Sequence, residues 1–187
     1  FLVSMLMPNS AGGKIGIKYQ MKGENHTVTT ACAAGTMAIG EGFRAVRDGR
    51  TDFVLCGGTE YVGGALGYAF RGFDVAGTLT TRNADPRGSS RPFDRDRDGF
   101  LFSAGGAAVL VLEELGHALK RGAQIYAEAA AYATNLDAYS IGPIRGGTRK
   151  NTSRWSSSVT PSPMTVIVAR KSCTPSSGTT VMLTLGT

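Results

Sequence analysis

The chain has 187 residues, 42% of them hydrophobic, and a formal net charge of +6 at neutral pH. This is enough for one domain with a buried core, and no apolar run approaches the length that spans a bilayer. Three cysteines, at positions 32, 56 and 173, have neither metal-site spacing nor the even number of a disulfide framework. These features predict a protein of a reducing compartment, cytoplasmic or alternatively organellar, with no metal, no cofactor and no membrane contact. Because the sequence starts at Phe1 and not at a methionine, we expect a piece of a longer protein. It shows no charged-then-apolar leader, which agrees with the predicted intracellular location.

The basic charge is confined to the last quarter of the chain. Residues 1–142 contain 14 Lys/Arg and 14 Asp/Glu, whereas residues 143–187 contain 6 Lys/Arg and no acid. The second segment is also rich in Ser and Thr, and such a sharp shift in composition marks a boundary. We therefore predict a folded region over 1–142 and a separate basic tail over 143–187. The even charge balance of the first region argues against nucleic-acid binding.

The pattern along residues 1–142 alternates between strands and helices, as in α/β proteins. We predict a buried strand over Val28–Ala31 and then a helix over Ala33–Arg47 that Gly49 ends. Glycines within that helix cost helix stability but allow another part of the chain to approach closely. The later predicted elements are strands at Phe53–Cys56 and Ala107–Leu112, a helix at Leu115–Arg121 ended by Gly122, and a strand at Ile125–Ala133.

Cys32 lies where the predicted strand gives way to the predicted helix. A thiol at a helix N-terminus experiences the partial positive charge of the unpaired N–H groups, which favours the nucleophilic thiolate. A strand, a sharp turn and a cysteine at a helix start together present a sulfur for acyl transfer. The alternative is that Cys32 is a small buried residue that packs the strand against the helix. The local sequence leaves both interpretations open.

Several ordered blocks resemble the β-ketoacyl-[acyl carrier protein] synthases, the condensing enzymes of fatty-acid synthesis. Thr30–Gly35 is similar to the nucleophile turn of that family, and Asp52–Glu60 is similar to its next strand and Gly-Gly turn. The other similar blocks are Thr81–Pro86, Ser90–Asp94, Arg97–Phe100, Val109–Gly122 and Asp137–Tyr139. The resemblance covers Phe1 to about Gly142, and it implies part of the N-terminal half of a thiolase-like, layered α/β/α/β/α fold.

The resemblance also implies a reaction. Cys32 would take an acyl chain from the thioester of an acyl carrier protein, with its own backbone N–H as one donor to the oxyanion. A malonyl group on a second carrier protein would then lose CO₂, and its enolate would attack the acyl thioester. Phe73 matches the phenylalanine that lines the acyl pocket of chain-elongating members, with ordinary core packing as the alternative. Members of the family form homodimers, and Asn25–Thr30 corresponds to a strand at their contact.

The two catalytic histidines of the family lie in Asn-Ala-His-Gly-Thr and Gly-His-x-x-Gly-Ala motifs, and neither motif occurs in this sequence. His26 and His117 match neither histidine. We expect His26 to face solvent or a subunit contact, and His117 to lie on the surface. We therefore expect no condensation by this chain alone. The alternatives to a fatty-acid enzyme are a fragment of a type II polyketide ketosynthase and a non-catalytic remnant that only pairs or binds.

Arginines and aspartates alternate after residue 90, and two interpretations fit them. The carrier proteins of the family are acidic, so the basic side chains are candidates for docking them by electrostatic attraction. Alternation with carboxylates instead favours a local salt-bridged loop. The residues concerned are Arg91, Arg95, Arg97 and Arg121 on the basic side, and Asp94, Asp96 and Asp98 on the acidic side.

The tail contains one predicted strand, at residues 165–169. One interpretation of the tail is a natural, disordered basic extension. We prefer a frameshift in the coding sequence, because codons for residues 181–185 can spell Asp-Val-Asn-Ala in the adjacent frame, close to a motif of the family.

Overall fold

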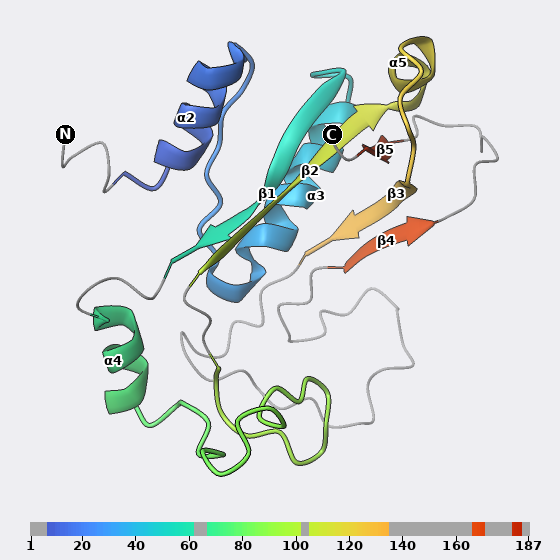
Figure 1. Cartoon of the computed structure of the whole chain (residues 1–187). Coiled ribbons are helices and arrows are strands. Elements are labelled where there is room, and N and C mark those ends of the chain that lie inside the picture. The colour runs from blue at the N-terminus through green and yellow to red at the C-terminus, as the bar shows by residue number, and fades with distance from the viewer. Residues whose placement is uncertain (1–6, 62–66, 102–104, 135–165, 171–180, 185–187) are drawn as a thin grey trace. The chain divides into compact units, whose positions relative to one another are not determined.

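A computed structural model of the chain describes residues 7–61, 67–101, 105–134, 166–170 and 181–184 (Figure 1). The chain divides into two units, Phe1–Gly58 with Val109–Thr187, and Thr59–Ala108. The block predicted at Asp137–Tyr139 lies outside the described residues. The helices and strands are α2 (Ser10–Tyr19), the short 3-10 helix η1 (Ala31–Ala33), α3 (Ala34–Arg47), β1 (Phe53–Glu60), α4 (Tyr68–Val75), β2 (Gly106–Glu114), α5 (Leu115–Lys120), β3 (Ala127–Ala133), β4 (Val166–Arg170) and β5 (Val181–Thr184).

The strands form one five-stranded sheet in the order β1-β2-β5-β3-β4. Strand β5 pairs antiparallel with both β2 and β3, and β4 pairs antiparallel with β3. The N–H of Glu114 donates to the carbonyl of Asp52 at 2.9 Å, so the start of β1 lies beside the end of β2. The predicted strand at residues 165–169 is confirmed as β4, and the tail thus supplies two strands to this sheet.

The core of the first unit lies between α3 and the sheet. Its buried side chains come from one helix and three strands: Phe43 and Val46 of α3, Cys56 of β1, Leu112 of β2 and Ala129 of β3. Two glycines let α3 approach the strands. A Cβ on Gly42 would lie 3.1 Å from Cγ1 of Val54, and a Cβ on Gly40 would overlap the ring of Tyr132. The predicted close approach is confirmed at these two positions.

Replacing Gly40 by alanine tests this contact. We expect Gly40→Ala to lower the free energy of unfolding by about 1–2 kcal/mol, since the new methyl group must displace the Tyr132 ring, over which the Arg44 guanidinium stacks at 4.8 Å. The better helix propensity of alanine, about 1 kcal/mol, offsets part of the larger cost of overpacking. Urea denaturation measures the change. Gly35→Ala is the control, because a Cβ there has nothing within 4 Å; equal effects of the two variants would contradict the packing argument.

The helix ends agree with the sequence patterns. Helix α3 stops at Arg47, just before Gly49 with φ +69°, and α5 stops at Lys120, just before Gly122 with φ +67°. Glycine tolerates this left-handed backbone, which ends a helix without steric cost. The predicted helices at Ala33–Arg47 and Leu115–Arg121 are therefore confirmed to within one residue.

Two strand predictions need correction. The strand predicted at Val28–Ala31 is wrong: residues 23–30 have no strand pairing, and Ala31 turns away with φ +49°. A strand needs a neighbouring backbone, and no strand of the described sheet lies beside this segment. The strand predicted at Phe53–Cys56 exists but is longer, because β1 continues through Gly57 and Gly58, where a turn was predicted. The strands predicted at Ala107–Leu112 and Ile125–Ala133 are confirmed as β2 and β3.

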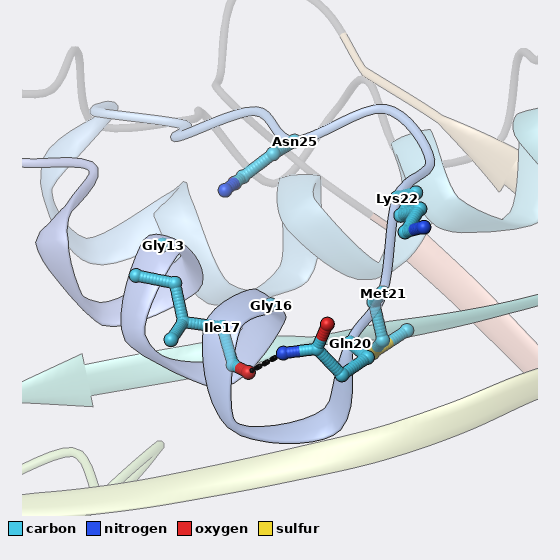
Figure 2. A pocket seen from close by; sticks show the side chains of 7 residues that line it. All are labelled: Gly13, Gly16, Ile17, Gln20, Met21, Lys22 and Asn25. Atoms are coloured by element: carbon cyan, nitrogen blue, oxygen red, sulfur yellow. Dashed lines mark hydrogen bonds between the residues drawn. The ribbon is translucent and has the colours of Figure 1, made fainter.

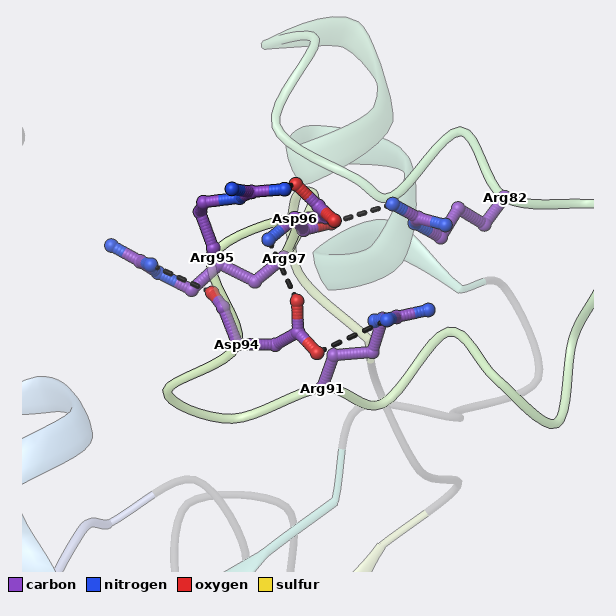
Figure 3. Close-up of polar contacts among 6 residues, drawn as sticks. All are labelled: Arg82, Arg91, Asp94, Arg95, Asp96 and Arg97. Carbon is purple, nitrogen blue, oxygen red and sulfur yellow. Dashed lines mark hydrogen bonds and ion pairs between the residues drawn. The ribbon is translucent and has the colours of Figure 1, made fainter.

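The second unit contains α4 and a long loop that is pinned by carboxylates. Residues Leu79 and Phe100 form a parallel bridge, and one Asp98 oxygen accepts from the N–H and the hydroxyl of Thr81, each at 2.8 Å. These hydrogen bonds lower the pKa of Asp98 below its usual value. Arg91 pairs with Asp94 at 3.0 Å and Arg95 pairs with Asp96 at 3.3 Å (Figure 3). The prediction of a local salt-bridged loop is confirmed.

Candidate active site

Cys32 lies in the η1 turn, two residues before α3 begins. The turn is closed by the N–H of Ala33, which donates to the carbonyl of Thr30 at 3.1 Å. Ala31 adopts a left-handed backbone with φ +49°, which is uncommon for a residue with a side chain and typical of functional sites. The Cys32 side chain is exposed. The alternative of a buried packing residue is therefore wrong, and the thiol is accessible to a substrate.

The positive end of the α3 dipole lies beside this thiol. The residue before the helix is Ala33, no side chain caps the helix, and its first turn contains no acidic residue. The N–H groups of Ala33 and Ala34 donate to the carbonyls of Thr30 and Ala31, and the helix start carries the partial positive charge of the helix dipole. An oxygen that develops negative charge next to Cys32 would be stabilised there.

Strand β1 approaches the start of α3 through two glycines. A Cβ on Gly58 would lie 3.4 Å from the Cα of Gly35, three residues after Cys32. The end of β1 therefore lies at van der Waals distance from the first turn of α3. Both glycines belong to sequence blocks that resemble the family, but sequence reasoning did not predict that they meet.

An exposed ion-pair cluster lies on the segment that leads to the turn. Glu24 accepts from Arg50 at 2.7 Å and pairs with His26 at 3.2 Å, which ties this segment to the loop after α3. The His26 side chain is 70% exposed, as predicted, and its described contact is with Glu24 and not with Cys32. His117 was predicted on the surface but is half-buried. Its ring contacts the Glu113 carboxylate and stacks on Phe53 at 6.4 Å.

The second described cysteine has the opposite environment. Cys56 is buried in the core, where burial raises the pKa of its thiol to about 12. Its Sγ lies 3.9 Å from the carbonyl of Leu110. At neutral pH this thiol is almost never ionised, so it is not a nucleophile. Of the two described cysteines, only Cys32 has the accessibility that thioester chemistry requires.

Phe73 lies on α4, in the second unit, and not in the unit that holds Cys32. Its ring packs edge-on against Phe100 with 5.6 Å between the ring centres, and the residue is 37% exposed. The sequence stretch Arg97–Phe100 was noticed for its resemblance, but its contact with Phe73 was not predicted. Whether Phe73 lines an acyl pocket remains a prediction.

A shallow cavity of about 280 Å³ lies at the C-terminal end of α2, a helix that the sequence patterns did not predict (Figure 2). The Gln20 amide donates to the carbonyl of Ile17 at 2.8 Å beside it. The lining residues are Gly13, Gly16, Ile17, Gln20, Met21, Lys22 and Asn25. None of the predicted site residues lines this cavity, and Lys22 is its one titratable side chain.

No group of three His, Cys, Asp or Glu side chains in the described ranges is placed to hold a metal ion. In the same part of the chain, no helix is long and apolar enough to cross a membrane.

Comparison with known proteins identifies the family. Residues 1–118 match the family model described as the N-terminal domain of β-ketoacyl synthases. The chain belongs to the β-ketoacyl synthase family. It is 48% identical over 153 residues to 3-oxoacyl-[acyl-carrier-protein] synthase 2 of Synechocystis, covering 80% of this chain and 36% of that protein. It is 43% identical over 142 residues to a mitochondrial 3-oxoacyl-[acyl-carrier-protein] synthase of Arabidopsis thaliana, covering 75% of this chain and 30% of that enzyme.

The solved structures that are similar to this chain belong to the same family. A β-ketoacyl synthase of Burkholderia phymatum is 36% identical, with a TM-score of 0.65 over 73% of this chain and 32% of that chain. A type II polyketide ketosynthase, bound to a hexaketide and in complex with its acyl carrier protein, is 36% identical to this chain. The TM-score is 0.64, and the match covers 70% of this chain and 32% of the ketosynthase chain. The chain thus spans about a third of the relatives that it matches. Its fold is an α/β part of the N-terminal domain of this thiolase-like family, as predicted.

Proposed function

We propose that this chain carries the acyl-accepting cysteine of a 3-oxoacyl-[acyl carrier protein] synthase of fatty-acid elongation. The observation that carries the proposal is the exposed Cys32, held in a turn with a strained Ala31 immediately before the uncapped start of α3. The names of the relatives support it, since they are 3-oxoacyl-[acyl-carrier-protein] synthases.

In the first step, the Cys32 thiolate attacks the carbonyl carbon of an acyl thioester on a carrier protein. The C–S bond to the carrier breaks, the carrier thiol leaves, and the acyl group remains on Cys32. The backbone N–H of Cys32 and the start of α3 would stabilise the oxyanion that forms on the way, and a donor of this kind is worth roughly 3–4 kcal/mol.

In the second step, malonyl on another carrier protein loses CO₂, and the resulting enolate attacks the acyl-Cys32 carbonyl. Cys32 leaves as thiolate, and the acyl chain is longer by two carbons. The family places the histidines of this step in motifs that this sequence does not contain. For this chain by itself we therefore propose the acylation half-reaction only.

We also propose an acyl-chain contact at Phe73, a subunit contact at Asn25–Thr30 and a location for the protein. Phe73, with Phe100 against it, would contact the acyl chain. The segment Asn25–Thr30, exposed over most of its length and without a described strand partner, would pair with a second subunit. The relatives are bacterial and mitochondrial enzymes, which supports a cytoplasmic or organellar location.

A second candidate function is polyketide synthesis, and the similarity to the type II polyketide ketosynthase supports it. The same cysteine chemistry serves both pathways. The fatty-acid reading is preferred because the similar proteins named above include two 3-oxoacyl-[acyl-carrier-protein] synthases at higher identity.

Mass spectrometry after incubation with an acyl-[acyl carrier protein] thioester tests the proposal. We expect an added acyl mass on the peptide that contains Cys32, and none in the Cys32→Ala variant. A Cys56→Ala variant should still be acylated, because that thiol is buried. Absence of the adduct from a folded chain would refute the proposal.

A further inference from the structure

Strand β5 fills a space one strand wide between β2 and β3 (Figure 1). It pairs antiparallel on both sides, so that Met182 lies opposite Glu113 of β2 and opposite Glu128 of β3. Strand β2 lies within the part of the chain that matches the family model, whereas β5 comes from the basic tail beyond that match. Among the described strands, β2 and β3 are therefore joined only through a segment that is distant from both in the sequence.

Strand β5 is shorter than the space that it fills. It has four residues, against nine in β2 and seven in β3. Its pairing covers Val111–Glu114 of β2 and Ala127–Ala129 of β3, and on this side the remaining residues of both strands have no strand partner within the described ranges. A strand edge with unpaired N–H and C=O groups is a template for a further strand. The space thus offers more backbone hydrogen bonds than β5 uses.

The register of the neighbouring strands defines which occupant fits the space. Leu112 and Ala129 belong to the core beneath α3, and they lie opposite positions 183 and 181 of the occupant. Residues directly opposite each other share one face of a sheet, and alternate positions along a strand lie on the same face. Positions 181 and 183 are therefore on the buried face, where apolar residues stabilise the sheet. The sequence has Val181 and Leu183 at these positions.

Charge defines the position between these two. Position 182 lies opposite Glu113 on one side and Glu128 on the other. Like charges directly opposite each other destabilise a sheet, so an occupant needs a neutral or basic residue here, and the sequence has Met182. Proline is excluded as well, because it lacks the N–H that a central strand donates. The space therefore fits an extended segment with apolar residues two positions apart, no acid between them and no proline.

We propose that the space between β2 and β3 is a strand-binding site, which β5 fills as a tethered ligand and which accepts a separate peptide strand in its place. The fitting partner is an extended apolar segment of another polypeptide, bound mainly through backbone hydrogen bonds. Only four residues hold β5, so the exchange opens a small part of the sheet and not the whole fold. The proposal goes beyond the chemistry of Cys32 and does not depend on it.

Anisotropy titration of a fluorescently labelled peptide of residues 178–187 against the full 187-residue chain tests the site. Met182→Pro in the chain removes a β5 N–H and the competition by the tethered strand, so we expect this variant to bind the peptide with a Kd lower by about tenfold or more. Ile167→Pro is the matched control, because it breaks the edge strand β4, which pairs only with β3 among the described strands. This control should leave Kd as in the unmodified chain, and equal Kd values for the two variants would overturn the proposal.

Substitutions in the peptide test the register. With the Met182→Pro chain as receptor, a peptide that carries Met182→Glu should bind about tenfold more weakly or worse, because its carboxylate lies opposite Glu113 and Glu128. A peptide that carries Met182→Lys should bind at least as tightly as the natural sequence. If the glutamate and lysine peptides bind equally well, the peptide adheres without this register, and the strand-binding site is refuted.

Hydrogen exchange on the unmodified chain tests the same site without a proline variant, which could fail to fold. We expect the backbone N–H groups of residues 181–184 to be protected, and an excess of unlabelled peptide to remove that protection. The N–H groups of residues 111–114 and 127–129 should stay protected, since the peptide replaces β5 beside them. Protection of residues 181–184 that survives the excess of peptide would overturn the exchange, and a lack of protection there without peptide would overturn the role of β5 as the tethered ligand.

Discussion

Iodoacetamide at pH 8 is expected to alkylate Cys32 and to leave Cys56 unmodified in the folded chain. Alkylation requires the thiolate, and burial raises the pKa of Cys56 to about 12, so roughly one Cys56 thiol in ten thousand is ionised at this pH. The Cys56 side chain is also shielded in the core between α3 and the sheet, whereas Cys32 is exposed. The two rates should therefore differ by a factor on the order of a thousand or more.

Peptide mass spectrometry over a time course measures both rates in one sample. A Cys173→Ser background removes the third thiol, which lies outside the described residues. Addition of urea should abolish the difference, because unfolding exposes Cys56. Comparable alkylation of both cysteines before urea is added would contradict the packing of β1 against α3.

The turn that contains Cys32 and the helix after it were predictable because their signals are local. A cysteine followed by small residues and then by an amphipathic run defines the start of α3, and Gly49 defines its end. These patterns act over a few residues, so they hold whatever packs around them. The salt-bridged loop after residue 90 was predictable for the same reason, because its arginines and aspartates pair with partners no more than three positions away.

The errors concern features that depend on distant parts of the chain. Residues 28–31 have the composition of a strand, but a strand exists only beside another, and none of the described strands pairs with them. Gly57 and Gly58 have the composition of a turn, yet they continue β1, and Gly58 lies beside the first turn of α3. Helices α2 and α4 were missed: α2 has three glycines among its ten residues, α4 is only eight residues long, and none of the residues of either helix is buried.

Removal of the Glu113 side chain is expected to destabilise the folded chain strongly. Glu113 is 1% exposed at the end of β2, and its two oxygens accept from the Nε and Nη2 atoms of Arg121, each at 2.7 Å. The ring of His117 contacts the same carboxylate. This one side chain therefore holds α5 and the residue after it against the sheet.

We expect Glu113→Ala to lower the free energy of unfolding by about 2–4 kcal/mol, since it breaks a buried charged network and leaves a cavity. Glu113→Gln keeps the volume and can still accept a hydrogen bond, so about half of that loss is expected. Urea denaturation at pH 7 measures both variants. Glu41→Ala is the matched control, because the ion pair of Glu41 with Arg44 is solvent-exposed and should contribute below 1 kcal/mol.

The dependence on pH separates the charge of Glu113 from its packing. Hydrogen bonds from Arg121, and to a lesser degree from His117, lower the pKa of Glu113 in the folded chain below the usual 4.5. A carboxyl with a lowered folded pKa stabilises fully above its unfolded pKa, and that contribution is lost as the pH falls through the folded pKa. The difference between the unmodified chain and Glu113→Ala should accordingly shrink as the pH falls below about 4.5, until only the packing contribution remains. A difference that stays constant down to pH 3 would mean that Glu113 stabilises the fold by its volume alone.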